Sequence, residues 1–277
     1  ELTEREIKEF FNDKTDVVYI PAGRSMITLL SNQMNYIYSS MDDIQKRNMD
    51  YCTRSYLEKI LQMKSVFTIS PVEMLNDVIA MTYIKIDEER AKESISLMKQ
   101  LLRGEYINKD GEERLQVSKN RYVKLNYASS GQQEVVWILN VLFYYLLNGE
   151  STYFIIEEPE SHLFPNSQKL VMEFIALVCN GNGNQLFLTT HSPYILGTIN
   201  NLLYADKVSR NVDKSELNRI ISKNKWLNFD KVNAIFVQNG KIKSCLDKEF
   251  KSIENEVIDG ASEQINEDYD KMLELKG

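Results

Sequence analysis

A continuous apolar run leads directly into two adjacent carboxylates in Phe154-Ile155-Ile156-Glu157-Glu158-Pro159-Glu160. The evenly apolar character of residues 153–156 predicts a central parallel strand that is covered on both faces. Because neighbouring strand residues point to opposite sides, the two glutamates are expected to have different roles. At the carboxyl end of a parallel strand, one acid can hold Mg²⁺ through its water shell while the next orients an attacking water. The alternative is a charged loop that caps a strand.

The segments on either side of this run predict a parallel α/β sheet. Residues 167–179 have a helical pattern and residues 186–189 form a second buried strand. A strand, a helix and a strand in this order are the crossover unit of such sheets. Residues 17–20 predict one more short strand, and residues 132–147 predict a strongly apolar helix.

The other segments predict helices in the first half of the chain and hairpins elsewhere. Apolar residues recur at helical spacing from residue 26 to residue 61, and helices are expected to begin at Pro71 and Asp87. The methionines and aromatic residues of 26–83 fit a helical core, with a partner-binding groove as the alternative. Two-residue turns are expected at Asp110-Gly111, Lys119-Asn120 and Asn239-Gly240. A helix is expected from residue 261, with an apolar stripe formed by Ile265, Tyr269, Met272 and Leu273.

Two further segments carry candidate chemistry at the ends of predicted elements. Upstream, Ala128-Ser129-Ser130-Gly131-Gln132 precedes the apolar helix. Backbone N–H groups at such a helix start suit a γ-phosphate, with an ordinary N-cap as the alternative. Downstream, Thr189-Thr190-His191-Ser192-Pro193 ends a strand with one of only two histidines. This histidine could hydrogen-bond a phosphate oxygen or the attacking water, or it could be structural.

At these residues the chain resembles the ABC-type ATPases. Residues 128–132 resemble the signature loop, residues 154–158 resemble a Walker B strand with its catalytic glutamate, residues 161–163 resemble the D-loop, and His191 resembles the switch histidine. The resemblance covers residues 129–204. The Glu-Glu-Pro-Glu-x-His-Leu and Thr-His-Ser-Pro strings are most similar to bacterial AAA-domain ATPases of the OLD-like group, including those of Septu-type anti-phage systems.

The resemblance implies a role for each position. Glu157 would hold Mg²⁺ with its water shell, Glu158 would polarise the attacking water, and His191 would act as the second catalytic group. The implied nucleotide contacts are Ser129, Ser130, Gly131, Gln132 and Ser161. The signature loop would complete the nucleotide site of a second subunit, so that ATP holds a head-to-tail homodimer together. Ser130 and Glu157 stand where transporter-type proteins carry glycine and aspartate, and both changes are tolerated in the OLD-like group.

One part of such an ATPase has no counterpart in the sequence. No Gly-x-x-x-x-Gly-Lys-Ser/Thr string occurs, and the only Gly-Lys pair, Gly240-Lys241, lies in a predicted hairpin. Because the sequence also begins at Glu1, we expect it to be a fragment that lacks an N-terminal segment with the phosphate-binding loop and is inactive alone. A separate polypeptide is the alternative source. Arg24 follows the strand of residues 17–20 and could approach the nucleotide, or it could be a surface arginine that caps a helix pair.

The composition limits the class of protein. A formal net charge of -7 over 277 residues argues against a surface that attracts nucleic acid everywhere, and leaves DNA binding neither supported nor excluded. Cys52, Cys179 and Cys245 are too far apart for a disulfide framework or a zinc site. No apolar run approaches the ~20 residues that cross a bilayer, and the N-terminus lacks a signal-peptide pattern. A cytoplasmic protein without membrane association is expected.

Together these patterns predict an α/β fold, a partial P-loop NTPase of ABC ATPase type. Residues 1–24 would supply a strand of the core, residues 25–103 an inserted helical subdomain, and residues 104–277 the C-terminal core. The expected function is ATP hydrolysis by a dimer that controls a nuclease or a DNA-directed partner, with anti-phage defence as one setting. The alternatives are a transporter's nucleotide-binding subunit and a non-hydrolysing scaffold. Residues 203–277 hold scattered acids without a strand-end cluster, so no intrinsic nuclease is expected.

Overall fold

The computed structural model describes residues 15–25, 28, 36, 39–42, 44–45, 50–81, 86–254 and 256–275, with the backbone alone for residues 256–264. The chain divides into two compact units, residues 1–190 and 191–277. Most of the helical pattern predicted for residues 26–49 lies outside the described residues. The domain boundaries predicted at residues 24 and 103 stay predictions.

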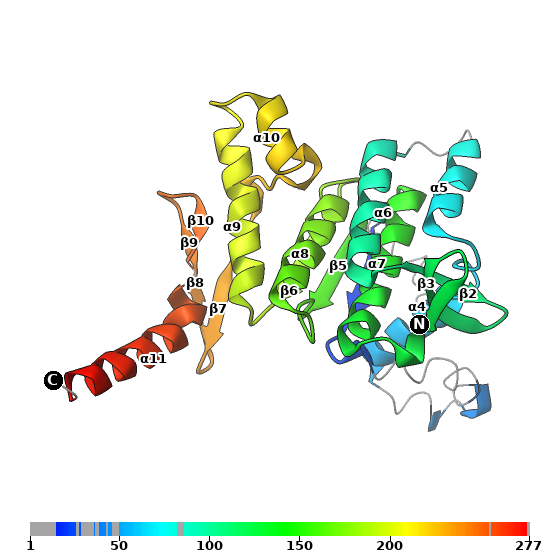
Figure 1. Ribbon diagram of the computed structural model, residues 1–277, viewed down its shortest axis with the longest axis horizontal. Coiled ribbons are helices and arrows are strands. Elements are labelled where there is room, and N and C mark those ends of the chain that lie inside the picture. Colours follow the sequence, from blue (N-terminus) through cyan, green and yellow to red (C-terminus); the bar gives the residue numbers. More distant parts are fainter. Residues whose placement is uncertain are drawn as a thin grey trace. The chain divides into compact units, whose positions relative to one another are not determined.

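The first unit is built on a parallel sheet. In the described part of the chain its strands follow the order β1 (Asp16–Ile20), β5 (Thr152–Glu157) and β6 (Gln185–Thr189) (Figure 1). Both strand pairs are parallel, and the register pairs Glu157, the last residue of β5, with Thr189, the last residue of β6. The predicted parallel α/β sheet with the glutamate strand at its centre is confirmed. All three strands therefore end at one edge of the sheet.

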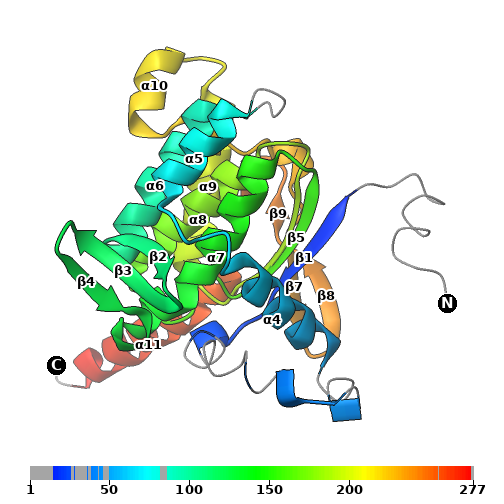
Figure 2. The same ribbon diagram turned by 90° about the vertical axis from the view of Figure 1, so that its right-hand side faces the viewer.

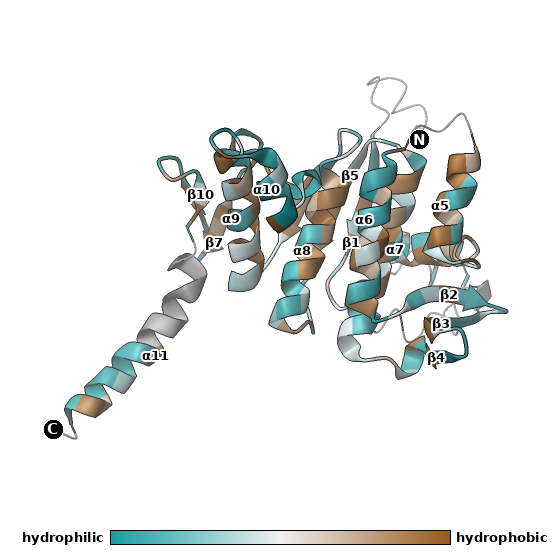
Figure 3. Ribbon diagram, turned by 45° about the horizontal axis from the view of Figure 1, so that its top comes forward, coloured by the Kyte–Doolittle hydropathy of each residue, from teal (hydrophilic) through white to brown (hydrophobic). Residues whose placement is uncertain are grey.

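Three helices pack on one another along one side of this sheet. They are α6 (Glu88–Leu102), α7 (Ser130–Asn148) and α8 (Pro165–Cys179) (Figure 2). Residues 133–143 of α7 are all buried, and α8 is polar in its first turns and apolar toward its C-terminal end (Figure 3). On β5, Phe154 and Ile156 are fully buried while Tyr153 and Ile155 are partly exposed. The second face of this strand is therefore covered less completely than the evenly apolar run predicted.

The other elements that the structure describes in the first unit come from the region between β1 and α7. They are α4 (Tyr51–Met63), α5 (Pro71–Ala80), an antiparallel sheet of β2 (Glu105–Lys109), β3 (Glu112–Ser118) and β4 (Arg121–Lys124), and a 3₁₀ turn, η1 (Leu125–Tyr127). The predicted turn at Asp110-Gly111 is confirmed, with φ values of 53° and 79°. The helix expected after Asp87 is also confirmed, and Asp87 is its N-cap. Since α6 packs against α7 and α8, the predicted inserted region contributes directly to the core.

The second unit has its own small core. Its elements are α9 (Pro193–Val208), α10 (Lys214–Ile220), η2 (Lys223–Lys225), η3 (Phe229–Lys231), β7 (Ile235–Gln238), β8 (Lys241–Ser244), β9 (Leu246–Asp247), β10 (Ser252–Ile253) and α11 (Glu256–Glu274). Leu203, Cys245 and Ile253 are buried together, and the Asn200 amide exchanges two 2.8 Å hydrogen bonds with the backbone of Ile253. The predicted β7–β8 hairpin and C-terminal helix are confirmed, and the apolar stripe of α11 is exposed. Among the described helices, none is long and apolar enough to span a membrane.

The start of α5 gives a stability prediction. The Ser70 hydroxyl accepts a hydrogen bond from the N–H of Glu73 at 3.2 Å, and Glu73 Oε2 accepts one from the N–H of Ser70 at 2.8 Å. Replacing Ser70 with alanine removes this cap and is expected to lower the free energy of unfolding by about 1 kcal/mol in urea denaturation. Ser65→Ala is the matched control, because Ser65 is exposed and caps no helix start. An equal loss in both variants would contradict the prediction.

Candidate functional site at the carboxyl edge of the sheet

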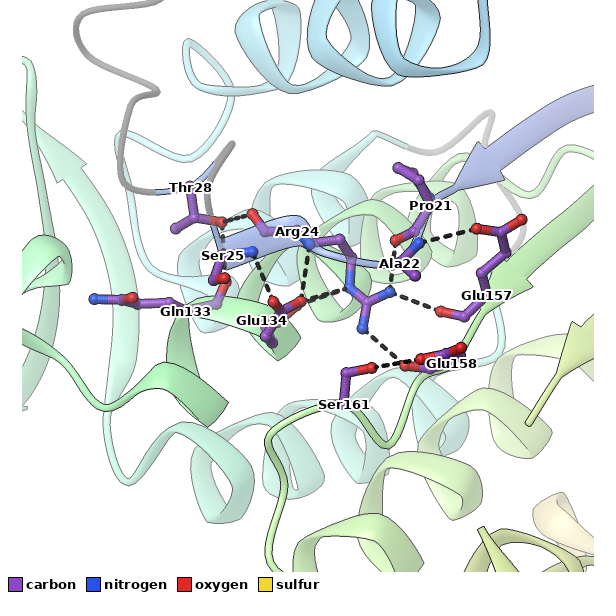
Figure 4. Close-up of polar contacts among 10 residues, drawn as sticks. All are labelled: Pro21, Ala22, Arg24, Ser25, Thr28, Gln133, Glu134, Glu157, Glu158 and Ser161. Atoms are coloured by element: carbon purple, nitrogen blue, oxygen red, sulfur yellow. Dashed lines mark hydrogen bonds and ion pairs between the residues drawn. The ribbon is translucent and has the colours of Figure 1, made fainter. Parts of the chain in front are cut away.

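Glu157 and Glu158 both lie at the carboxyl edge of the sheet, where the chain leaves β5. Glu157 is the last strand residue, whereas Glu158 begins a turn with a φ of 41°, in the left-handed region. The N–H of Glu158 donates to the carbonyl of Thr189 at 3.0 Å, which holds this turn against the end of β6. Strand alternation is therefore not what separates the two carboxylates. The turn at Glu158 does so, and Figure 4 shows the two side chains reaching different neighbours.

The Glu157 side chain contacts the end of β1. Its Oε2 accepts a hydrogen bond from the N–H of Ala22 at 3.1 Å. Burial, together with a hydrogen bond to Glu157, raises the pKa of Tyr19 to about 12, so Tyr19 stays a neutral donor. These contacts hold the Glu157 carboxylate at the sheet edge.

The donor set of this edge fits a magnesium–nucleotide complex. Proteins commonly hold Mg²⁺ through one or two carboxylates, with water and nucleotide phosphates completing the octahedral shell. Within the described ranges, no group of three or more His, Cys, Asp and Glu side chains forms a metal cage of its own. A metal held by Glu157 would therefore depend on phosphate oxygens and water for most of its shell.

The turn after Glu158 is held by side chains of the same segment. Ser161 Oγ donates to Glu158 Oε2 at 3.3 Å, and the N–H of Ser161 donates to the Glu158 carbonyl at 3.1 Å. Thr190 Oγ1 donates to Glu160 Oε1 at 2.6 Å, which links the turn to the chain just beyond β6. Ser161, an expected nucleotide contact, thus lies beside the candidate catalytic glutamate, while Glu160 has a structural contact.

Arg24 is fully buried, so its interpretation as a surface arginine is wrong. Its guanidinium donates to the backbone carbonyls of Pro21 at 2.6 Å, Glu157 at 2.7 Å and Glu158 at 3.0 Å, and its Nε donates to that of Glu134 at 3.1 Å. All four hydrogen bonds go to the protein's own backbone (Figure 4). These contacts account for the guanidinium donors, and the expected contact between Arg24 and nucleotide stays a prediction.

The loop before α7 combines a helix cap with an exposed surface. Ser129 is the N-cap, and its N–H donates to Gln132 Oε1 at 3.0 Å while the N–H of Gln132 donates to Ser129 Oγ at 3.4 Å. Gln132 Nε2 also donates to the Leu102 carbonyl at 2.7 Å, which ties α7 to the end of α6. Ser129 and Ser130 are exposed. The N-cap interpretation is confirmed, and contact with a phosphate stays a prediction.

The structure brings this loop against the turn of residues 161–163. Gly131 is buried, and a Cβ at this position would lie 2.8 Å from the His162 carbonyl oxygen and 3.1 Å from Leu163 Cδ2. Real Cβ atoms do not come so close to a backbone oxygen. Glycine is therefore needed at Gly131 because it lets two predicted segments, about 30 residues apart in sequence, touch.

His191 is the first residue of the second unit. It follows Thr190 directly and is exposed. Its proposed meeting with Glu158 stays a prediction, because it depends on a site shared between the two units.

Glu134 is a residue of this site that sequence reasoning missed. It is buried with Arg24, and its two oxygens accept hydrogen bonds from the N–H groups of Arg24 at 3.0 Å and Ser25 at 2.9 Å. A signal was present, since Glu134 is the only charged residue of α7 and lies among apolar residues. Buried carboxylates need partners, so such a residue predicts a buried cation nearby.

The α/β fold, with two adjacent carboxylates at the carboxyl edge of a parallel sheet, fits the P-loop NTPases as a class. The model of the AAA ATPase domain family matches residues 5–196, and the chain belongs to this family. Membership supports ATP binding and hydrolysis in general, with Mg²⁺ as the metal that such ATPases use. No curated protein matches the chain.

Proposed function

We propose that this chain is part of an ABC-type ATPase in which Glu157 and Glu158 divide the work of hydrolysis. The observation that carries the proposal is the turn at Glu158, which follows the central parallel strand and sends two adjacent carboxylates to different neighbours. Glu157 would bind Mg²⁺ with its water shell. Glu158 would accept a proton from the attacking water, and His191 would assist from the start of the second unit.

The remaining contacts in the proposal come from a second copy of the protein. Ser129, Ser130 and Gly131 would place backbone N–H groups and the positive end of the α7 dipole near the γ-phosphate bound by the other subunit. The exposure of Ser129 and Ser130 supports this arrangement. ATP would then hold two subunits together, and hydrolysis would release them. Since the 277 residues contain no phosphate-binding loop motif, the proposal also needs such a loop from elsewhere in the natural protein or from a second polypeptide.

We further propose that this ATP-dependent dimer controls a nuclease or a DNA-directed partner. The support is the similarity of the Glu-Glu-Pro-Glu-x-His-Leu and Thr-His-Ser-Pro strings to the OLD-like group, which includes anti-phage ATPases. The partner would bind one state of the ATPase better than the other, because a nucleotide can shift an equilibrium only by its differential affinity for two states.

The test of this function is the oligomeric state of the full-length protein with and without nucleotide. Light scattering is expected to show a dimer with ATP and Mg²⁺ and a monomer with ADP, and phosphate release is expected to require Mg²⁺. A protein that stays in one oligomeric state under all conditions and releases no phosphate would instead favour a non-hydrolysing scaffold.

A further inference from the structure

A fully buried ion pair lies beside the candidate catalytic turn. Arg24 and Glu134 are both 0% exposed, and Arg24 Nε lies 3.4 Å from Glu134 Oε2. Taking two charges out of water is costly, and apolar residues of similar volume often stabilise a core equally well. Stability alone therefore does not explain this pair, and the positions of its hydrogen bonds point to a second role.

The Arg24 guanidinium donates hydrogen bonds to the peptide units on both sides of Glu158. Its Nη1 donates to the Glu157 carbonyl. The N–H of the same peptide unit belongs to Glu158 and donates to the Thr189 carbonyl. Its Nη2 donates to the Glu158 carbonyl at 3.0 Å. A left-handed conformation is unfavourable at a non-glycine residue, so it persists only where neighbouring groups hold it. Arg24 and Thr189 together hold the backbone of Glu158 in this conformation.

The glutamate ties the same arginine to helix α7. Glu134 Oε2 and Oε1 accept the N–H groups of Arg24 and Ser25, and the Glu134 carbonyl accepts Arg24 Nε. Thr28 Oγ1 lies 3.0 Å from the Arg24 carbonyl and 2.9 Å from the Gln133 carbonyl, which adds another link between this segment and α7. Helix α7 begins at the loop proposed to touch the second subunit's nucleotide. The pair thus connects that loop, through one helix, to the glutamate turn.

We propose that Arg24 and Glu134 are positioning residues for ATP hydrolysis. They hold the backbone of Glu157 and Glu158, so that the Glu158 carboxylate is directed at the attacking water, and they couple this geometry to the first turns of α7. The inference rests on the proposed function. It assigns the pair to the hydrolysis step and not to nucleotide binding, which was one of the two interpretations that the sequence left open for Arg24.

The test compares Arg24→Lys and Glu134→Gln with wild type in the full-length protein. A lysine keeps the charge but cannot reach several carbonyls with one planar fork, and glutamine keeps the shape of Glu134 without its charge. Each variant is expected to lower kcat for ATP about 10- to 100-fold, as loss of a group that orients a reacting residue does. KM for ATP and ATP-dependent dimerisation are expected to stay close to wild type, because a group that serves only the transition state changes kcat.

Arg90→Lys is the matched control. Arg90 lies on α6 and donates to the Leu177 carbonyl at 2.6 Å, so it is also an arginine bound to backbone, but outside the candidate site. It is expected to leave kcat unchanged. Circular dichroism and thermal unfolding establish that each variant is folded, and Glu134→Gln carries the test alone should Arg24→Lys not fold.

The outcomes separate this inference from the function on which it rests. The positioning role would be overturned if Arg24→Lys and Glu134→Gln fold and have the same kcat as Arg90→Lys. If Glu158→Gln is inactive in the same assay, the proposed function stays intact. A raised KM with unchanged kcat would also overturn it, because Arg24 would then serve binding. Wild-type hydrolysis by Glu158→Gln would remove the proposed function and this inference together.

Discussion

The Glu158→Gln variant is expected to hydrolyse ATP about 10²- to 10⁴-fold more slowly than wild type, the range that a general base contributes. Glutamine retains the size and hydrogen-bonding shape of the side chain but cannot take a proton from water. Its amide can still lie beside Ser161, whose hydroxyl lies 3.3 Å from Glu158 Oε2. The fold and the ATP affinity should therefore survive. The ATP-bound dimer should persist, because the step that ends it is blocked.

The measurement is phosphate release together with the lifetime of the dimer after a pulse of ATP. Glu150→Gln is the control, because Glu150 is an exposed acid just before β5, at the opposite end of the strand from Glu158. It should hydrolyse ATP at the wild-type rate. A Glu158→Gln dimer that dissociates as fast as wild type would argue that Glu158 has no part in hydrolysis.

The parts of this site that the sequence predicts are those set by local interactions. Serine at a helix start, with glutamine three residues later, makes the capping box of Ser129 and Gln132 from neighbouring groups alone. The apolar run that leads into Glu157 likewise predicts a buried strand from the types of neighbouring residues. The strand and the N-cap, which was the alternative interpretation of the loop, are both confirmed, because the signal for each lies within a few neighbouring residues.

The parts that the sequence does not predict depend on distant contacts. Arg24 and Glu134 are 110 residues apart, and no local pattern says that these two meet. The left-handed turn at Glu158 is also hidden, because a glutamate carries no preference for positive φ and is held there by Arg24 and Thr189. Helix α10 was missed for another reason. Seven residues without a buried side chain give no helical periodicity to detect.

The Gly131→Ala variant is expected to destabilise the first unit by about 1–3 kcal/mol, the usual cost of overpacking a close contact. The added methyl group would lie 2.8 Å from the His162 carbonyl oxygen, and that oxygen is backbone that cannot rotate away. Relief requires a shift of the turn of residues 161–163 relative to α7. Such a shift also moves Ser161, which donates to Glu158. The decrease in kcat should therefore be larger than the decrease expected from the smaller fraction of folded protein.

Gly197→Ala separates the close contact from the general effect of adding a methyl group to a helix. Gly197 lies within α9, and a Cβ there meets nothing within 4 Å. Alanine is favoured over glycine in helix interiors by up to roughly 1 kcal/mol, so this variant should be at least as stable as wild type. The stabilities of the two variants are compared by thermal unfolding. Phosphate release is measured at a temperature well below the unfolding transition. Equal stability of Gly131→Ala and Gly197→Ala would mean that the turn yields easily, and that the contact between residues 131 and 162 does not hold Ser161 in place.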